Sequence, residues 1–133
     1  MISGSAQGSS PAAGHPNRRA HNWLIYSYMD RLLGASAPLF HGTVYDLGCG
    51  EAPYRDWILG HADHYVGIDW SDSPHKVRAD IIANLACPLP VDDAIADAVI
   101  SLSVLEHLPD PQIMLSEACR ILKPGGHLVL QVP

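Results

Sequence analysis

The fold is decided by residues 44–50, which read Val-Tyr-Asp-Leu-Gly-Cys-Gly. A short apolar run leads into Asp46, and Gly48 and Gly50 follow one residue apart. This order predicts a buried strand that turns sharply into a ligand-binding loop, because glycine tolerates positive φ and lets a ligand approach the backbone. The amides that follow can then point at polar ligand groups. A glycine pair at a strand end is also typical of a bare tight turn, so this motif alone leaves both interpretations open.

Strand-like and helix-like segments alternate from residue 41 to the end of the chain. This alternation predicts an α/β fold with a doubly wound, mostly parallel sheet. The strands read as continuous apolar runs, which is typical of parallel strands covered on both faces. Asp69–Lys76 contains Pro74 and is short for a crossover helix. The predicted strands are Thr43–Leu47, His64–Ile68, Val77–Ala83, Ala96–Leu102 and His127–Val132, and the predicted helices between them are Tyr54–Leu59 and Asp110–Leu122.

Three parts follow from the chain's local composition. Residues 1–17 are rich in Ser, Gly, Ala and Pro and lack a hydrophobic period, so we expect a disordered leader there. Residues 18–40 carry apolar side chains at helical spacing and predict an N-terminal helix. Residues 41–133 form the α/β domain. Within it, Lys123-Pro124-Gly125-Gly126 predicts the turn that separates the last helix from the last strand.

Composition limits the class of partner. The 133 residues are 47% apolar and 17% charged, which is typical of one soluble globular domain. A net charge of −6 argues against a nucleic-acid or anionic-membrane footprint and favours a small-molecule partner. No apolar run approaches the ~18 residues of a membrane span, and no signal peptide is evident. Three cysteines, Cys49, Cys87 and Cys119, predict reduced, buried thiols, so we expect a cytoplasmic protein.

Two positions bear on the cofactor. A dinucleotide fingerprint needs a third glycine where Pro53 stands, and Glu51 would repel a pyrophosphate, so NAD is disfavoured. Asp69 ends the second predicted strand nineteen positions after Gly50. This is close to the ~20-residue spacing at which an acid accepts hydrogen bonds from ribose hydroxyls. An acid at this place can also be only a turn residue, but together with the glycine loop it favours a nucleoside-type ligand.

The chain resembles the class I S-adenosylmethionine-dependent methyltransferases of the small bacterial type. The resemblance covers roughly residues 43–133 and implies a Rossmann-like sheet of order 3-2-1-4-5. The family's last two strands are missing here, which implies a C-terminally truncated protein or fragment with an incomplete domain. Four ordered motifs carry the resemblance: Tyr45-Asp46-Leu47-Gly48-Cys49-Gly50, Val66-Gly67-Ile68-Asp69, Asp97–Ser101 leading to Val104-Leu105-Glu106-His107, and Arg120–Gly126.

The resemblance also implies a set of cofactor-binding residues at successive strand ends. An amide at position 84, where many relatives carry Asp, can still accept a hydrogen bond from the adenine amine. Ala52 stands where many relatives have another glycine. The implied contacts are Asp46, Gly48, Cys49 and Gly50 for the methionine part, Asp69 with the adjacent Trp70 for the ribose, Asn84 with the adjacent Leu85 for the adenine, and Ser101 and Ser103 beneath the sulfonium.

Methyl transfer from a sulfonium is a direct displacement, so no covalent residue is required. Glu106 and His107 are the only nearby candidates for a general base, which is needed only for a weakly acidic hydroxyl or a protonated amine. The same pair is similar to the E-x-x-E-H motif of a metal-dependent branch that methylates small-RNA 3′ ends. Ser103 replaces that motif's first glutamate, and we predict no metal site.

Other residues have both a chemical and a packing interpretation. Cys49 lies where a helix N-terminus would activate a thiol, although a small residue that packs under the loop is favoured. His61 and His64 have ligand-like spacing but no partner at a recognisable distance, which favours a solvated turn. Trp23, Tyr26 and Tyr28 form either a lid over the ligand or part of the core.

Three functions remain open from the sequence. The ordered motifs favour a methyltransferase that acts on an unidentified, small-molecule acceptor. A non-catalytic, truncated module that binds the cofactor is the first alternative, and an NAD-dependent oxidoreductase is the second. A sheet that ends at the fifth strand would expose an apolar edge, His127–Val132, that can pair with another chain, and the oligomeric state is not predicted.

Overall fold

The structure is a computed structural model that describes residues 22–71 and 77–133. The predicted leader, residues 1–17, lies outside the described residues, as do the first residues of the predicted 18–40 helix. Most of the Asp69–Lys76 connection lies outside them as well. Within the described ranges, no helix is both long enough and apolar enough to cross a bilayer.

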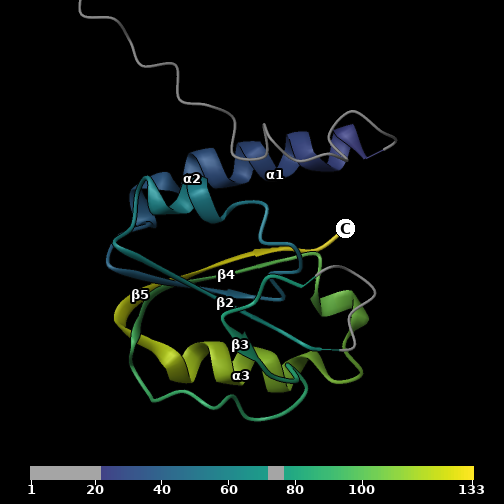
Figure 1. Cartoon of the computed structure of the whole chain (residues 1–133), viewed down its shortest axis with the longest axis vertical. Coiled ribbons are helices and arrows are strands. Elements are labelled where there is room, and N and C mark those ends of the chain that lie inside the picture. Colours follow the sequence, from purple (N-terminus) through teal and green to yellow (C-terminus); the bar gives the residue numbers. More distant parts are fainter. Residues whose placement is uncertain (1–21, 72–76) are drawn as a thin grey trace, which may run out of the picture.

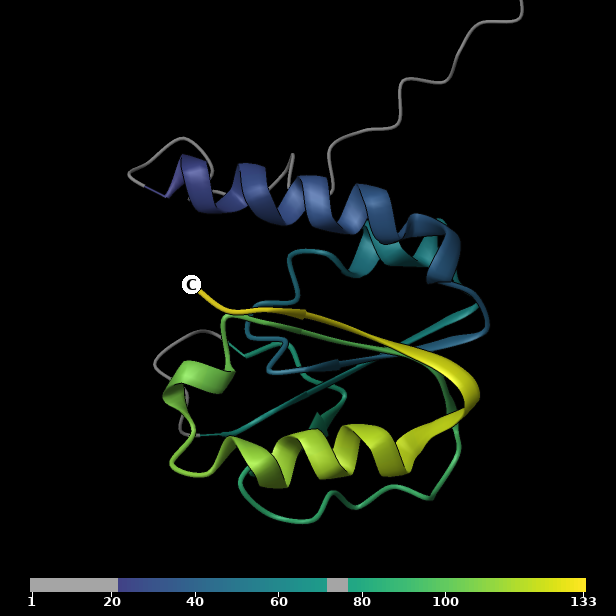
Figure 2. The same cartoon turned by 180° about the vertical axis from the view of Figure 1, so that it is seen from behind.

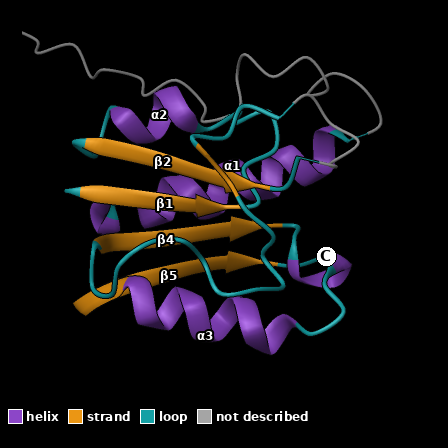
Figure 3. Cartoon of the chain, turned by 60° about the horizontal axis from the view of Figure 1, so that its bottom comes forward, coloured by secondary structure: helices purple, strands orange, loops and turns teal. Residues whose placement is uncertain are grey.

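Five parallel strands form one sheet in the order β3-β2-β1-β4-β5. This arrangement confirms the predicted fold class and strand order. The labelled arrows in Figure 3 all point the same way, so the carboxyl ends of the strands share one edge. The strands are β1 (Thr43–Leu47), β2 (His64–Asp69), β3 (Ile81–Ile82), β4 (Ala96–Leu102) and β5 (Leu122–Gln131).

Helices cover both faces of the sheet. The long helix α1 (Trp23–Ser36), with the 3-10 turn η2 (Ala37–Leu39) after it, lies with α2 (Arg55–Leu59) on one side. Helix α3 (Pro111–Ile121) lies on the other side, as Figures 1 and 2 show from opposite directions. A second 3-10 turn, η3 (Leu105–His107), joins β4 to α3. Helix α3 begins as the sequence predicts, because the Asp110 side chain accepts a hydrogen bond from the Gln112 amide at 3.1 Å.

Two hydrophobic clusters fill the spaces between the sheet and its helices. Successive residues of β1 point to opposite faces, so Val44 packs toward α1 and α2 while Tyr45 and Leu47 pack toward α3. Leu33, Leu47, Ile58, Ile68, Ile100 and Ile121 are fully buried. Each such side chain contributes about 1.5–3 kcal/mol on burial. The sheet is therefore the shared wall of two cores.

The third predicted strand, Val77–Ala83, is wrong in length, since only Ile81 and Ile82 pair with β2. The Gly67 amide donates a hydrogen bond to the Asp80 side chain at 2.8 Å, whereas in a longer strand it would donate to a backbone carbonyl. The Arg78 amide instead donates to the Gly50 carbonyl at 2.8 Å. The Asp80 amide still donates to the Gly67 carbonyl at 2.8 Å, so the segment leaves the sheet edge before Asp80, where it is bound to the glycine loop.

The last strand begins earlier than predicted. Leu122 already pairs with Ala96, and regular pairing resumes at His127 opposite Ala98. The residues between, Lys123–Gly126, form a bulge inside β5 instead of a turn before it, and Gly125 has a φ of +82°. As predicted, β5 lies at an edge of the sheet; whether that edge pairs with another chain stays a prediction.

The prediction of three buried thiols is correct only for Cys49. Cys87 lies exposed in the loop before β4, and Cys119 lies on the outer face of α3. No disulfide was predicted, and all three thiols are free. The error arises because Cys119 is flanked in sequence by the buried Ala118, while its own side chain points to the opposite side of the helix.

Asp97 connects three strands at the amino end of the sheet. Its Oδ2 accepts a hydrogen bond from the Thr43 amide of β1 at 2.8 Å, and Lys123 of β5 donates to both of its oxygens at 3.1 Å. These donors lower the pKa of Asp97, with the Thr43 amide as the largest cause. Gly42 precedes the strand with a φ of +57°, and a Cβ there would lie 2.0 Å from Asp97 Oδ2.

We therefore expect Gly42→Ala to lower the free energy of unfolding by about 2–4 kcal/mol, because it adds left-handed strain and displaces Asp97 from Thr43. Gly34→Ala is the control. Gly34 lies in α1 with no atom within 4 Å of an added Cβ, so this change should stabilise by about 0.5–1 kcal/mol. Urea unfolding of both variants measures the difference. Equal stability of the two would contradict the role of Asp97.

Candidate functional site

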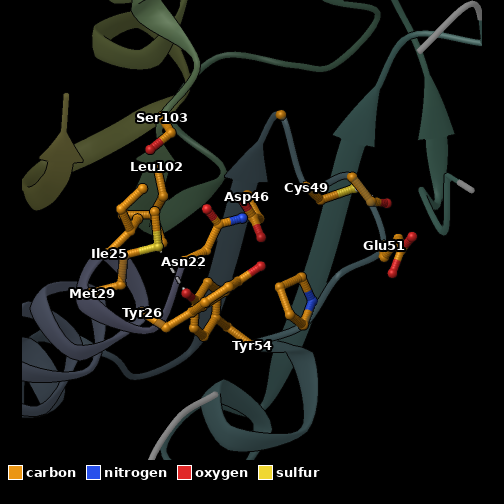
Figure 4. Close-up of a pocket in the computed structure, with 13 residues that line it drawn as sticks. Asn22, Ile25, Tyr26, Met29, Asp46, Cys49, Glu51, Tyr54, Leu102 and Ser103 are labelled. Carbon is orange, nitrogen blue, oxygen red and sulfur yellow. Dashed lines mark hydrogen bonds between the residues drawn. The ribbon is translucent and has the colours of Figure 1, made fainter. Parts of the chain in front are cut away.

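A cavity of about 310 Å³ opens at the carboxyl ends of β1 and β4, beneath α1. The strand order reverses between these two strands, and open α/β sheets bind ligands at such a switch point. Figure 4 shows Asp46 in the middle of the site, with side chains of α1 to one side and Cys49 to the other. The lining residues are Asn22, Ile25, Tyr26, Met29, Asp46, Gly48, Cys49, Gly50, Glu51, Pro53, Tyr54, Leu102 and Ser103.

The two glycines of the loop have different physical roles. Gly48 has a φ of +87°, and a Cβ there would lie 2.3 Å from Val104 Cγ2, so this position must be glycine for the loop to pack. Gly50 has a φ of +52° and faces open space, with no atom within 4 Å of an added Cβ. Gly50 is among the residues that line the cavity.

The amides of Gly48, Cys49 and Gly50 are bonded within the protein instead of pointing at a ligand. Those of Gly48 and Cys49 both donate to the Ile68 carbonyl, at 2.8 and 3.3 Å, and the Gly50 amide donates to Asp69 Oδ2 at 2.6 Å. Both acceptors belong to the end of β2. These three amides therefore fix the loop to β2.

Ala52 occupies a backbone conformation that favours glycine. Its φ is +53° and its side chain is buried in the core beneath α1 and α2. The methyl group is accepted because it packs, although an L-residue in the left-handed region is strained by about 1–2 kcal/mol. The position thus keeps the backbone geometry that a third glycine would supply.

Asp46 is the charged centre of the site. Its carboxylate is buried, it lines the cavity, and its Oδ2 accepts a hydrogen bond from the Tyr65 hydroxyl at 2.5 Å. Burial raises the pKa of Asp46 from 3.8 to about 7, while the Tyr65 hydroxyl opposes the rise and the nearby Asp69 adds to it. No cation is among the described side chains that line the cavity. The described lining therefore offers the Asp46 carboxylate no counter-ion, and a cationic ligand group would supply one.

Asp69 ends β2 next to the glycine loop, but neither it nor Trp70 lines the cavity, so their assignment to the ribose stays a prediction. Its two oxygens accept from the Gly50 amide at 2.6 Å and from the Trp70 amide at 2.7 Å. Each carboxylate oxygen retains a second lone pair that can accept a hydroxyl. The Trp70 side chain is 49% exposed beside it.

Asn84 and Leu85 are not brought to the cavity. The Asn84 side-chain oxygen accepts from the Ala86 amide at 2.9 Å, which forms a local turn, and Leu85 is buried in the core beside α3. Neither residue lines the cavity. Their assignment to an adenine stays a prediction.

The two serines at the end of β4 lie differently. Ser101 is fully buried on the α3 side, where its hydroxyl donates to the Leu47 carbonyl at 3.0 Å, so it does not line the cavity. Ser103 does line it and has a φ of +55°. The Ser103 amide and hydroxyl donate to the backbone and side-chain oxygens of Gln131, at 2.9 and 2.7 Å, which fixes this loop to β5.

The two candidates for a general base lie outside the cavity. Glu106 and His107 belong to η3, with His107 Nε2 3.7 Å from Glu106 Oε1 and the His107 side chain 77% exposed. Neither lines the cavity. Their arrangement favours the structural interpretation over proton transfer at this site.

Cys49 has the packing role that the sequence favours. Its thiol lies over Gly67 of β2, where an added Cβ would approach the sulfur to 2.8 Å. Burial, together with three nearby carboxylates, raises the pKa of the thiol to about 12. A thiol with this pKa is protonated at neutral pH, so Cys49 is unsuited to act as a nucleophile.

The residues of α1 that line the cavity are largely ones that the motifs did not identify. Asn22, Ile25 and Met29 line it together with Tyr26, and Met29 Sδ accepts a hydrogen bond from the Tyr54 hydroxyl at 2.9 Å. Of the three aromatic residues predicted as a lid or core, only Tyr26 reaches the cavity. Trp23 and Tyr28 are 58% and 62% exposed, so they belong to neither. Only the helical spacing of residues 22, 25, 26 and 29 could have identified this wall.

In the described ranges, no group of three or more His, Cys, Asp or Glu side chains is placed so that it could hold a metal ion. The His61 ring packs against Trp57, with centroids 4.5 Å apart and the planes tilted by 59°. His64 is the first residue of β2 and is exposed.

Residues 45–130 match the sequence pattern of a family described as the methyltransferase domain. The match covers more than half of the chain. The chain belongs to this family. The cavity at the switch point of a methyltransferase domain is therefore the candidate cofactor site.

Two curated relatives give the same family. The chain is 33% identical over 96 residues to a Mycolicibacterium smegmatis protein named a probable S-adenosylmethionine-dependent methyltransferase, which covers 68% of this chain and 37% of the relative. It is 30% identical over 95 residues to a Coxiella burnetii ubiquinone biosynthesis O-methyltransferase, which covers 64% of this chain and 41% of that enzyme. The chain thus spans well under two thirds of these relatives.

Solved structures show the same fold. A Pyrococcus horikoshii protein superposes with a TM-score of 0.67 at 20% identity, over 88% of this chain and 57% of the other. An Aquifex aeolicus S-adenosylmethionine-dependent methyltransferase superposes with a TM-score of 0.51 at 20% identity, over 62% and 51% of the two chains.

The pKa of Asp46 makes the stability of this methyltransferase domain depend on pH. Because the folded pKa of about 7 lies above the usual 3.8, this contribution to stability is fully present below pH 3.8 and is lost as the pH rises through 7. We expect Asp46→Asn to match the wild type near pH 4 and to be more stable at pH 8, by up to about 4 kcal/mol. Chemical unfolding at both pH values, without ligand, measures this.

Asp80→Asn is the control, since the ion pair with Arg55 lowers the pKa of that carboxyl. Its substitution should reduce stability at pH 8. A stabilising effect of Asp46→Asn that is equal at both pH values would contradict the assignment.

Proposed function

We propose that the chain is the cofactor-binding core of an S-adenosylmethionine-dependent methyltransferase that acts on a small molecule. The observation that carries the proposal is the buried Asp46 carboxylate, aimed into a cavity whose described lining holds no cation. The methionine part of the cofactor has an ammonium group, which is the counter-ion that Asp46 fits. The open space at Gly50 gives that part room beside the loop.

Asp69 extends the site toward the ribose. Its carboxylate is fixed by the Gly50 and Trp70 amides, so its remaining lone pairs are held in one orientation before a ligand binds. Asp46 and Asp69 lie on neighbouring parallel strands, at the ends of β1 and β2. The two acids therefore suit a ligand that carries an ammonium group at one place and hydroxyl groups at another.

When bound, the cofactor supplies an electrophilic methyl group on a sulfonium. The residues of the chain orient it and exclude water: Ile25, Met29 and Leu102 form an apolar wall opposite Asp46. Tyr26 and Tyr54 line the same cavity. Such a displacement depends on alignment in a dry site rather than on a covalent side chain.

The charged residues of the lining also limit the acceptor. Asp46 and Glu51 are the charged members of the described lining, and both are acidic. An anionic acceptor would be repelled, so we propose an uncharged or cationic small molecule and no nucleic acid. A relative's name, ubiquinone biosynthesis O-methyltransferase, agrees with a small-molecule acceptor.

We also propose a cytoplasmic location, on the net charge of −6 and the expected reduced thiols.

Gly50→Ala tests the site. The added methyl group would occupy the open space of the cavity, so we expect the affinity for S-adenosylhomocysteine to fall at least about tenfold in calorimetry, with stability lowered by about 1 kcal/mol. Gly125→Ala is the matched control: Gly125 also has positive φ and open space but lies in the β5 bulge. It should lose similar stability and keep its affinity.

Three further outcomes separate the competing functions. Transfer of a labelled methyl group from S-adenosylmethionine to an acceptor supports the enzyme. Binding without transfer would favour the non-catalytic module. Stabilisation by NAD but not by S-adenosylhomocysteine would favour the oxidoreductase and overturn the proposal.

A further inference from the structure

We propose that Tyr65 is a positioning residue, which holds the Asp46 carboxylate toward the cavity and sets the pH range in which the cofactor binds. The proposal rests on the cofactor assignment above. The contact that carries it is the Tyr65 hydroxyl, which donates to Asp46 Oδ2 at 2.5 Å inside the protein. Hydrogen bonds to an ionised acceptor are about twice as strong as neutral ones. Tyr65 therefore favours the ionised form of an acid that burial otherwise neutralises.

Gly67 allows Tyr65 to reach across the sheet. Tyr65 and Gly67 lie two residues apart on β2 and so share a face, and Gly67 is the residue paired with Asp46 on β1. A Cβ on Gly67 would lie 2.8 Å from Cys49 Sγ and 3.3 Å from Tyr65 Cε1, so the thiol and the edge of the aromatic ring share the space that a side chain would take. Because Gly67 has no side chain, the Tyr65 hydroxyl can reach the Asp46 carboxylate. Asp46 lies diagonally opposite Tyr65 on the neighbouring strand, β1.

Arg55 and Asp80 hold the ring of Tyr65 from the other side. The guanidinium carbon of Arg55 lies 5.0 Å from the Tyr65 ring centroid, which is a cation–π contact. Arg55 donates two hydrogen bonds to Asp80, at 2.9 and 3.0 Å, and Asp80 also accepts from the Gly67 amide at 2.8 Å. Arg55, Tyr65, Gly67 and Asp80 thus form one brace, which ends on Asp46.

The titratable groups around Asp46 come from several elements, and their effects on its ionisation support the positioning role of Tyr65. Tyr65 and Asp69 face it from β2, and Cys49 faces it from the loop. The other titratable groups of the cavity are Tyr26 of α1, Tyr54 before α2, and Glu51. The negative charge of Asp69 disfavours ionisation of Asp46, whereas the hydrogen bond from the Tyr65 hydroxyl favours it. Removing the Tyr65 hydroxyl should therefore shift the ionisation of Asp46 to higher pH.

Tyr65→Phe is the test, with Tyr45→Phe as the matched control. Tyr45 precedes Asp46 on β1, but its side chain packs into the opposite core. The affinity for S-adenosylhomocysteine is measured by calorimetry between pH 5.5 and 8.5, and urea unfolding without ligand is measured over the same range. We expect wild-type affinity to rise by tenfold or more with pH, because ligand binding favours the ionised carboxylate.

In Tyr65→Phe, the midpoint of this rise should move up by about one pH unit, so affinity should fall about threefold at pH 7.5 and about tenfold at pH 5.5. Its loss of stability without ligand should grow from pH 5.5 to 8.5, whereas a loss of packing alone would be independent of pH. Tyr45→Phe should keep the wild-type pH profile. If Tyr65→Phe does not fold, Arg55→Gln replaces it, with affinity about threefold lower and the same upward shift expected.

The outcomes separate this inference from the proposed function. If the wild type binds S-adenosylhomocysteine and Tyr65→Phe keeps the profile of Tyr45→Phe, the positioning role is overturned and the cofactor assignment stands. If the wild type binds no S-adenosylhomocysteine at any pH, both are overturned, even where the ligand-free unfolding still couples Tyr65 to Asp46.

Discussion

The structure depends on the burial of β1 on both faces of the sheet. This strand has a partner on each side, β2 and β4, and a hydrophobic core on each face. A strand in this position leaves its backbone no access to solvent except at its ends, so the chain must leave it through a turn that other segments can cover. The glycine loop meets this need, because its amides donate to the end of β2 rather than to water.

The same burial explains the electrostatics of the site. Asp46 is the only acid within β1, and it lies one residue before the strand ends. A buried carboxylate weakens the fold unless a partner satisfies it, and the described partner is a neutral hydroxyl from Tyr65. The buried carboxylate therefore lowers the stability of the fold at neutral pH, and a cationic ligand group would remove this destabilisation. Such strain is typical of binding sites, where stability is lower than the packing alone would give.

Much of the fold could be predicted from the sequence because its signals are local. β1 and β4 have the predicted bounds, and α3 begins at the predicted cap. The errors occur where tertiary contacts compete with local pattern. β3 is short because the Asp80 side chain takes a ladder position, and β5 begins early because Leu122 pairs with Ala96 across a bulge. Cys119 is exposed because its helix is buried on one side only.

The sequence by itself determined the family, the strand order and the acids at the ends of β1 and β2, since ordered motifs and apolar runs are readable along the chain. Only the tertiary structure decided which of these residues meet. It turned Ser101 toward α3, left Glu106 and His107 outside the cavity, and brought α1 over it. It also placed Tyr65 on Asp46, a contact between two strands that no local pattern encodes. The direction of a side chain depends on register and packing, which exist only once the sheet has formed.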